Sequence, residues 1–552
     1  MNRIYDFLLR FLGSMSAMGT LAAFLFFAAS LTPSLMPRTW VIQGILSGTC
    51  AATGYMIGVF IGWLWRYLEL PWLKKYVFTE RAITLAVAII VSIVFLWQAV
   101  GWQNSIRKLW GLELLDTATP FRMAGIASAT FFIWFVLGRL FRLAANRVSD
   151  WLDRYVPRRI SNVLGVAVAI LLFWSMGQGI VVKYALDAAD TSFQKADALM
   201  ETETVRPLSN SMTGSEQSLV SWDGLGRQGR YFVASGPRRD AISDFWKRDV
   251  LDPIRVYVGL NNAETVDQRA SLALEELKRQ GGFERSVLVV IAPTGTGWID
   301  PAAMDPLEYL HKGDVASIAL QYSYLTSWLS LLVEPENGLD AASALFHEVY
   351  SYWKTLPEDE RPRLYLHGLS LGALNSQMST DIYDVVSEPF QGALWSGPPF
   401  RSERWNAVTR MRNQNSPAWL PTFRDGSVIR FSNQFTRPEG DFAPWGPMRF
   451  IYLQYASDPV VFFDPASFYQ EPQWLKGERG PDVSPRFRWI PVITGLQLVF
   501  DMAIATSSPV GFGHVYAPED YIDAWVSLTD PPDVDAAAVD RLKRTLPASR
   551  YQ

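Results

Sequence analysis

Five long stretches without a charged residue fill most of the first third of the chain. Spanning the hydrocarbon core of a bilayer takes about 20 apolar residues. Four stretches are long enough, and the remaining one, with 16 residues, is marginal unless Pro120 and Phe121 extend it while Arg122 reaches the interface. Aromatic residues gather at the ends of the stretches, where amphipathic rings prefer to lie. The sequence therefore predicts a bundle of about five transmembrane helices, at residues 11–37, 39–65, 82–106, 123–138 and 160–182.

The distribution of lysine and arginine between the loops predicts the orientation of this bundle. The N-terminal tail and the loops at 66–81 and 139–159 carry twelve basic residues, whereas the loops at 38 and 107–122 carry four. Basic loops stay in the cytoplasm, so five crossings place everything after Lys183 outside it. The first stretch has 27 residues, more than the apolar part of a signal peptide, so we expect it to remain in a multi-pass protein of the inner (plasma) membrane.

Beyond this bundle the chain has the composition of a soluble protein with an α/β pattern. Residues 186–229 are polar and rich in Ser, Thr and Gly, which indicates a connector between a transmembrane domain at 1–185 and a catalytic domain at 230–552. Short apolar runs alternate with helical patterns in the catalytic domain, and this predicts a mostly parallel sheet with helices on both faces. The expected strands lie at residues 255–259, 287–292, 315–320, 364–367, 391–395 and 449–455.

Composition excludes several classes of function. The one cysteine, Cys50, rules out a disulfide within the chain and a cysteine-based metal site. The net charge of −4, without a basic stretch outside the membrane loops, argues against a nucleic-acid partner. No charged residue interrupts the apolar stretches, so nothing indicates an ion or proton pathway, and the bundle is interpreted as an anchor. No feature of the sequence identifies a protein partner.

The most informative motif is G-x-S-x-G at residues 368–372. It directly follows the expected strand at 364–367 and precedes a helical pattern from Ala373 to Val385. In the α/β-hydrolase fold, the serine of this motif lies on a tight, strained turn with its hydroxyl exposed, and the flanking glycines let strand and helix approach closely. This context predicts Ser370 as a nucleophile.

A serine nucleophile needs a base, and His514 is the only histidine that follows Ser370. The order of the triad along the chain in this fold is serine, then an acid, then histidine. We therefore predict His514, in a glycine-rich loop, as the base. His367 ends the strand that carries the nucleophile and is expected to help shape the site. His347 falls in a helical pattern and His311 in a loop, and neither is expected to act in catalysis.

The acid that orients the histidine is expected after the strand at 449–455. Asp458 follows that strand in the sequence Ala-Ser-Asp-Pro. A carboxylate there can hold the imidazole in the required tautomer and stabilise the imidazolium that forms. Asp464, six residues later, is the competing candidate.

An oxyanion hole requires two backbone N–H donors that are held in place before the reaction. The fold supplies one from the residue after the nucleophile, which is Leu371. The second is expected in the loop Pro-Thr-Gly-Thr-Gly-Trp after the strand at 287–292, at Thr294 or Gly295. A phosphate-binding loop is the alternative for this segment, but the lysine of such a loop is missing.

These motifs together resemble a particular family, the membrane-anchored bacterial α/β-hydrolases in which a multi-span N-terminal domain precedes a hydrolase domain. The resemblance covers nearly the whole chain and implies a serine esterase or lipase that uses no cofactor or metal. It also implies the triad Ser370, Asp458 and His514, in agreement with the interpretation above. The segments that carry the resemblance are 221–227, 293–298, 321–324, 367–372, 395–400, 456–459 and 513–514.

The substrate class and the reaction stay open to alternatives. The apolar segment 323–333 follows a strand and is either a lipid-contacting rim or lid, or a buried helix. Membrane tethering favours membrane lipids or other amphiphilic esters as substrates. An acyltransferase would use the same residues to pass the acyl group to an alcohol. A non-catalytic receptor or transporter is the third hypothesis, and both the complete triad and the uncharged spans count against it.

Overall fold

The computed structural model describes residues 15–70, 77–117, 119–175, 197, 204–325, 327, 329–330 and 336–551. The chain divides into two compact units, and each unit is formed from two separate stretches of the sequence. One unit comprises Met1–Ala185 together with Phe463–Ile504, and we call it the helical unit. The other comprises Leu186–Phe462 and Ala505–Gln552, and we call it the catalytic unit. Residues 463–504 thus leave the continuous range 230–552 that the sequence indicated for the catalytic domain.

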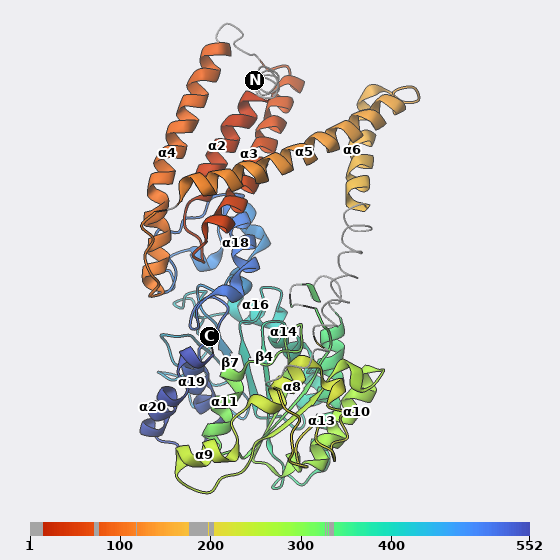
Figure 1. Ribbon diagram of the computed structural model, residues 1–552, viewed down its shortest axis with the longest axis vertical. Helices are drawn as coiled ribbons and strands as arrows, with labels where there is room; N and C mark the ends of the chain where they lie inside the picture. Colours follow the sequence, from red (N-terminus) through yellow and green to blue (C-terminus); the bar gives the residue numbers. More distant parts are fainter. Residues whose placement is uncertain are drawn as a thin grey trace. The chain divides into compact units, whose positions relative to one another are not determined.

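Apolar helices make up the N-terminal part of the helical unit (Figure 1). Four of the helices in the described residues are long and apolar enough to cross a membrane. The helix α2 is shorter, with 14 residues. The bounds are α2 (Ala17–Ser30), α3 (Trp40–Tyr67), α4 (Val77–Leu109), α5 (Pro120–Leu152) and α6 (Arg158–Ser175), and the segment 463–504 adds α18 (Ile493–Ala503).

The described residues therefore contain four long apolar helices, where the sequence indicated about five spans. The first apolar stretch contributes the short α2 and the loop that follows it, while residues 1–14 lie outside the described residues. The stretch at 123–138, which is marginal by length, belongs to the 33-residue α5. Its helix continues past Arg122 at one end and Arg139 at the other, because charged residues at the ends of an apolar helix do not interrupt its hydrogen bonds.

Glycines set the closest contacts between these helices. A Cβ atom on Gly58 of α3 would lie 2.4 Å from the carbonyl oxygen of Met18 on α2. A Cβ atom on Gly48 would lie 2.5 Å from the carbonyl oxygen of Ala127 on α5. Small residues of this kind are what membrane helices use to approach each other closely.

Large apolar side chains cover the outer surface of the helical unit. Trp97 on α4 is 83% exposed, and Ile90 and Ile93 on the same helix are each 60% exposed. On α5, Phe121 is 93% exposed. Surfaces this apolar are rare in water-soluble monomers and are typical of contact with lipid. The long apolar helices and this surface indicate a membrane protein.

The catalytic unit is built on a seven-stranded sheet in which every neighbouring pair of strands is parallel. The strand order is β1-β3-β2-β4-β5-β7-β6, so β4 lies in the middle. The register pairs Ala292 of β2 with Gly368 of β4, and Leu369 of β4 with Ser396 of β5. The bounds are β1 (Ile254–Val258), β2 (Val287–Ala292), β3 (Val315–Leu320), β4 (Arg363–Leu369), β5 (Gly392–Ser396), β6 (Ile429–Ser432) and β7 (Arg449–Leu453).

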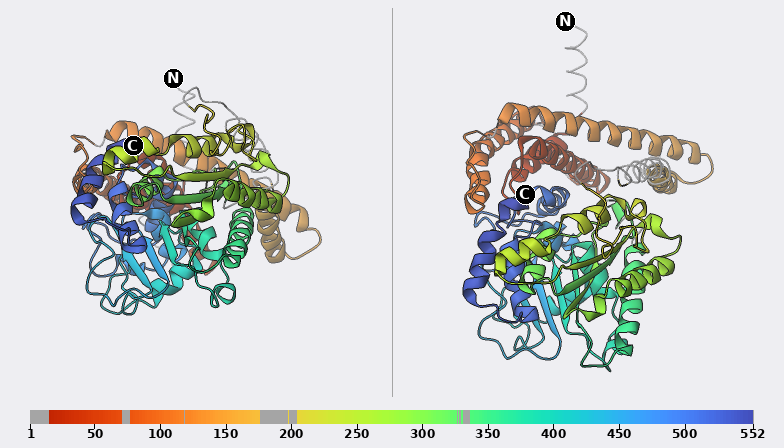
Figure 2. Two further views of the ribbon diagram at one scale, coloured as in Figure 1. Left: turned by 90° about the horizontal axis from the view of Figure 1, so that it is seen from below. Right: turned by 60° about the horizontal axis from the view of Figure 1, so that its bottom comes forward.

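Helices pack on both sides of this sheet (Figure 2). Helix α13 contacts α10 and α14, and helix α19 contacts α11 and α20. The bounds are α8 (Gly226–Ser235), α9 (Arg239–Trp246), α10 (Val266–Arg279), α11 (Pro301–Leu310), α13 (Asn337–Thr355), α14 (Leu371–Met378), α15 (Ile382–Val385), α16 (Glu403–Arg410), α17 (Pro459–Phe462), α19 (Pro518–Thr529) and α20 (Ala536–Thr545).

Local sequence explains where several of these helices begin. Thr265 and Gln268 form a reciprocal capping box at the start of α10. Asp300 accepts a hydrogen bond from the N–H of Ala302, and Pro301 occupies the first position of α11. Both devices satisfy N–H groups that have no partner inside a helix.

The α/β architecture that the sequence indicated is confirmed, with all six expected strands present within one or two residues at each end. The strand β6 was not predicted, since it has four residues and contains Arg430. The described part of the connector, residues 204–229, packs into the catalytic unit. Thr213, for example, is buried, and its hydroxyl donates to the carbonyl oxygen of Arg255 in β1 at 2.8 Å.

Candidate active site

Ser370 lies at the turn between β4 and α14, in a strained backbone conformation. Its φ and ψ angles are 57° and −123°. A non-glycine residue with positive φ is uncommon and persists only where the surrounding structure enforces it. Here the N–H of Ser370 donates to the carbonyl oxygen of Ser396, at the end of β5, at 3.0 Å. The turn therefore holds the serine at the carboxyl edge of the sheet, where parallel α/β folds place their ligands.

The two glycines of the motif are required by contacts at this turn. A Cβ atom on Gly368 would lie 2.3 Å from the carbonyl carbon of Gly372. A Cβ atom on Gly372 would lie 2.1 Å from the carbonyl oxygen of Ala292, at the end of β2. Neither distance can be tolerated, so only glycine at both positions lets β4, α14 and β2 meet this closely.

His514 and Asp458 form a buried pair. The Nδ1 atom of His514 lies 2.7 Å from Oδ2 of Asp458. The loop of His514 is closed by a hydrogen bond from the N–H of Gly511 to the carbonyl oxygen of Val515 at 2.8 Å. The N–H of Gly513 donates to the hydroxyl of Ser457 at 3.0 Å, which fastens this loop to the residue before Asp458.

Asp458 is completely buried and fully engaged in hydrogen bonds. Its Oδ1 accepts from the N–H of Val460 at 2.8 Å, at the start of α17. Its Oδ2 accepts from the hydroxyl of Tyr516 at 2.6 Å in addition to its contact with His514. Buried carboxylates are found where hydrogen bonds replace their hydration, and these bonds fix the direction in which Asp458 faces the imidazole.

The end of β5 brings the histidine next to the serine turn. Ser396 accepts the hydrogen bond from Ser370, and Gly397 follows it. A Cβ atom on Gly397 would lie 2.7 Å from Cε1 of His514 and 2.9 Å from the hydroxyl of Tyr516. Nε2, bonded to that same Cε1, is buried and has no hydrogen-bond partner among the described residues. Nδ1 is therefore held by Asp458, while Nε2 is free to accept a proton.

The candidate oxyanion donors differ in the hydrogen bonds that their backbone N–H groups already make. Leu371 is the first residue of α14, so its N–H has no partner inside the helix. The N–H of Thr294 is engaged in a turn, where it donates to the carbonyl oxygen of Trp298 at 3.0 Å. The N–H of Gly295 donates to the hydroxyl of Ser327 at 3.2 Å. A hydroxyl can rotate away, so Gly295 is the better of the two candidates in this loop.

The other acid and the other histidines lie elsewhere. Asp464 belongs to the helical unit, where its carboxylate accepts from the N–H of Ala466 at 2.8 Å and caps a short helical turn. His367 is buried in β4, and its Nδ1 contacts the carbonyl oxygen of Leu394 at 2.9 Å. Burial lowers the pKa of His367 to about 4 and that of His311 to about 3, so both are neutral at physiological pH. His347 is exposed on α13.

Two residues of the site were not identified from the sequence. Tyr516 donates to the carboxylate of Asp458, as described above. Asp300, on the loop after β2, is buried and lies 3.3 Å from the hydroxyl of Tyr521. Burial raises the pKa of Asp300 to about 7, and the neighbouring His514 opposes that rise. The sequence offered a weak signal for each: Tyr516 is two residues from the histidine, and Asp300 precedes a proline at a helix start.

The segment 323–333 is described only in part, because residues 326, 328 and 331–333 lie outside the described residues. Ser323, Leu325 and Ser330 are buried. The alternatives of a lid and a core helix stay open for the rest.

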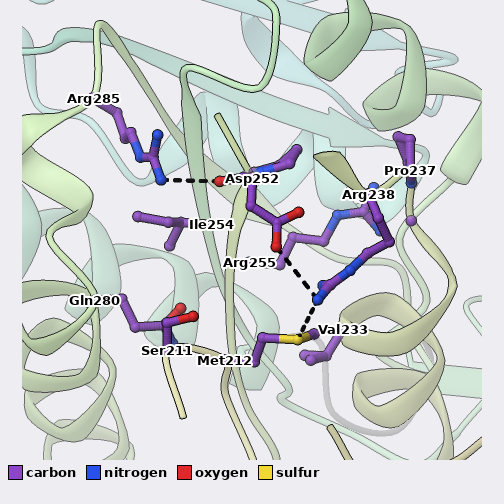
Figure 3. Close-up of a pocket in the computed structure, with 12 residues that line it drawn as sticks. Ser211, Met212, Val233, Pro237, Arg238, Asp252, Ile254, Arg255, Gln280 and Arg285 are labelled. Carbon is purple, nitrogen blue, oxygen red and sulfur yellow. Dashed lines mark hydrogen bonds and ion pairs between the residues drawn. The ribbon is translucent and has the colours of Figure 1, made fainter. Parts of the chain in front are cut away.

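A separate small pocket opens at the start of β1, and thus at the opposite edge of the sheet from Ser370 (Figure 3). Its charged groups are already paired: Arg238 lies 3.4 Å from Asp252, and Arg285 donates to the backbone oxygen of Asp252 at 2.9 Å. Arg255 is buried and contacts Glu308 at 2.6 Å. This pocket contributes nothing to the serine site.

Comparison with known proteins gives two matches and both are to family models. Residues 254–542 match the α/β-hydrolase family, and residues 31–237 match the N-terminal region of that family. No curated protein and no solved structure matches the chain. With a match that covers more than half of the chain and contains the serine turn, Asp458 and His514, the protein belongs to the α/β-hydrolase family.

Proposed function

We propose that this protein is a membrane-anchored serine hydrolase that cleaves carboxylic esters of lipid-like or amphiphilic substrates through an acyl-enzyme on Ser370. The observation that carries the proposal is the meeting of three features at adjacent strand ends. These are the strained turn of Ser370, the free Nε2 of His514 and the buried partner Asp458. Family membership supports hydrolase activity in general.

In the proposed reaction, Oγ of Ser370 attacks the ester carbonyl carbon while Nε2 of His514 takes the hydroxyl proton. The bond from that carbon to the alkoxy oxygen breaks, and the imidazolium returns its proton to the departing alcohol. Water then attacks the acyl-serine, again with His514 as base, and this releases the carboxylic acid and restores Ser370. Asp458 orients the imidazole and stabilises its positive charge.

The negative charge that develops on the carbonyl oxygen needs preorganised donors. The N–H of Leu371 is suited to this role, since it starts a helix and carries the positive end of the helix dipole. The N–H of Gly295 can join it once the hydroxyl of Ser327 rotates away. Removing one such donor costs about 10²–10³ in turnover in a well-studied protease, so the second donor matters as much as the first.

A lipid-like substrate is supported by the helical unit rather than by the triad. Its exposed apolar helices keep the enzyme in a bilayer, where amphiphilic esters are concentrated. The loop charges, twelve basic residues against four, support a catalytic unit outside the cytoplasm when the first apolar stretch is counted as a crossing. A reporter fused after residue 200 tests this placement, and a reporter that works only in the cytoplasm should be inactive there.

The experiment that tests the function uses the purified full-length chain in detergent. A fluorophosphonate probe should label the wild-type protein once and should not label Ser370→Ala. p-Nitrophenyl esters of increasing acyl length should be hydrolysed to free acid by the wild type alone. Labelling that survives in Ser370→Ala would overturn the assignment of the nucleophile, and wild-type protein that neither reacts with the probe nor hydrolyses any ester would overturn the function.

A further inference from the structure

The chain between the two triad partners leaves the catalytic unit. Asp458 precedes and His514 follows the segment 463–504, which packs among the membrane helices of the helical unit. Ile493 of α18 belongs to an apolar cluster with Leu46 and Cys50 of α3. The indole N–H of Trp110 donates to the carbonyl oxygen of Asp482 at 3.0 Å. The segment is therefore part of the membrane bundle in its packing, although it lies late in the sequence.

A buried ion pair fixes α18 in this bundle. Nε of Arg38 lies 3.2 Å from Oδ1 of Asp501, and neither side chain has any exposed surface. Arg38 also donates to Oε1 of Gln43 at 2.8 Å. Oδ2 of Asp501 accepts from the N–H of Leu35 at 3.0 Å and from that of Met36 at 3.4 Å. Both side chains are thus enclosed by directional hydrogen bonds.

A second polar contact joins α18 to the end of α2 and the loop that follows it. Nε2 of Gln497, one helical turn before Asp501, donates to the carbonyl oxygen of Thr32 at 2.9 Å and to that of Ser30 at 3.4 Å. These carbonyls lie at the end of α2, where the helix itself provides no donors. Two residues on one face of α18 therefore hold it against the loop between α2 and α3.

Such an ion pair determines the position of a helix more than it stabilises the fold. Burying two charges costs about as much as their attraction returns, whereas removing one partner leaves an uncompensated charge in an apolar interior. A directional pair of this kind can determine where a helix lies.

A few residues of the chain join each end of the segment to a residue of the triad. Asp458 caps α17, whose last residue, Phe462, adjoins the segment. At the other end the N–H of Ile504 donates to the carbonyl oxygen of Asp501 at 3.2 Å. The hydroxyl of Ser508 then donates to the carbonyl oxygen of Ala505 at 3.0 Å.

The last link is a close contact at the histidine loop. A Cβ atom on Gly513 would lie 2.1 Å from Oγ of Ser508, so the residue before His514 packs directly on the stem that leaves α18. The chain that leaves α18 therefore contacts the histidine loop within the catalytic unit.

We propose that Arg38 and Asp501 are a positioning pair for the segment 463–504, which lies between Asp458 and His514 in the sequence, and that turnover depends on this pair. The pair holds α18, and the chain that leaves α18 leads to the loop of His514. This inference rests on the proposed function, since it concerns the alignment of the same three residues.

Arg38→Gln and Asp501→Asn test the proposal in the full-length protein. A misplacement of about 1 Å far from the chemistry can lower turnover by about 10²-fold. We expect each variant to lose between about 10-fold and 10²-fold in kcat and in the rate of fluorophosphonate labelling, with KM nearly unchanged. Labelling is also measured in native membranes and normalised to the amount of inserted protein, so that a variant that does not survive purification still gives a result.

Two further variants separate position from folding. Arg38→Met combined with Asp501→Leu replaces the pair by apolar side chains, a change that proteins often tolerate; we expect this variant to fold and still to show the lower kcat. Glu308→Gln breaks a buried ion pair with Arg255 in the catalytic unit, away from the triad, and should keep wild-type kcat.

The possible outcomes distinguish the two proposals. Wild-type kcat and labelling rate in the inserted Arg38→Gln and Asp501→Asn variants, or in the apolar double variant, would overturn the positioning role while leaving the hydrolase intact. Wild-type protein that is never labelled at Ser370 would overturn the proposed function itself. An equal loss of kcat in Glu308→Gln would show that any buried charge defect has this effect, and would also overturn the positioning role.

Discussion

Asp458 and Asp464 are six residues apart in sequence, yet they belong to different compact units. Asp458 faces His514 at 2.7 Å, whereas Asp464 caps a helical turn in the helical unit. Sequence order narrowed the acid to these two, because both follow the strand that precedes the histidine. Their environments, which depend on the path of the chain after α17, distinguish them.

The first prediction compares these two acids. Asp458→Asn should lower turnover on a p-nitrophenyl ester by about 10⁴-fold, the loss seen when the acid of a serine protease is neutralised, because the imidazole then takes the wrong tautomer. Asp464→Asn keeps a capping side chain and should stay within a few-fold of wild type. Steady-state kinetics of the two purified variants provide the measurement. Near-normal turnover in Asp458→Asn with a loss in Asp464→Asn would mean that the acid is misassigned.

The second prediction concerns Asp300 and the pH dependence of stability. Its pKa in the folded protein is about 7, against an ordinary value of 3.8. Because the folded pKa is raised, the protonated form contributes stability at low pH, and this contribution is lost as pH rises from about 4 to about 7. Asp300→Asn cannot ionise and keeps an N-cap for α11.

This variant should therefore lose less stability than wild type over that pH range, and its advantage should be largest above pH 7. Thermal unfolding in detergent at a series of pH values measures the difference. If the stability of both proteins changes with pH in the same way, the pKa of Asp300 does not differ between the unfolded and folded states.

At the scale of elements, strands were predicted best where their physical signal was strongest. Strands such as β2 and β3 are buried on both faces and are continuous apolar runs, which is what a central parallel strand requires. The edge strand β6 lacks such a run and was missed. The serine turn was predicted because its glycines are forced by contacts within a few residues. The role of Tyr516 could not be predicted, since it depends on a contact with a residue 58 positions away in the chain.

The third prediction tests the serine turn as an element. Gly372→Ala places a Cβ atom where the carbonyl oxygen of Ala292 lies 2.1 Å away, so β2 and α14 must separate. Overpacking of this kind costs about 1–3 kcal/mol, and the turn that carries Ser370 should lose its geometry. We expect fluorophosphonate labelling to fall below detection in this variant. Gly446→Ala in the same unit, whose Cβ atom would be 3.4 Å from its nearest neighbour, is the control and should label normally.

At the scale of the whole molecule, the return of the chain to the helical unit over residues 463–504 was not predicted from the sequence. Residues 463–504 contain mixed charge and only one short apolar helix, α18, too short to be recognised as a span. Their place in the helical unit depends on pairing across the entire chain, chiefly between Arg38 and Asp501. No local pattern records such a pairing.

The fourth prediction follows from this division. A chain that begins at residue 186 retains the whole catalytic unit but leaves Asp501 without Arg38 and exposes the apolar side of α18. We expect it to aggregate and to resist labelling, whereas the full-length protein in the same detergent is monodisperse and labelled. Size-exclusion chromatography with in-gel fluorescence measures both properties. A soluble, labelled fragment would show that the catalytic unit is independent of the helices.

The pairing of Arg38 with Asp501 also has a consequence for biosynthesis. The two residues are 463 positions apart, so a ribosome has made nearly the whole chain before they can meet. The apolar helices α2 to α6 emerge and enter the membrane early, and the serine turn follows with no histidine available to it. His514 follows α18 in the sequence, so its imidazole is made among the last segments of the chain. If His514 is the base, as proposed, the newborn chain carries its nucleophile well before it carries the group that activates it.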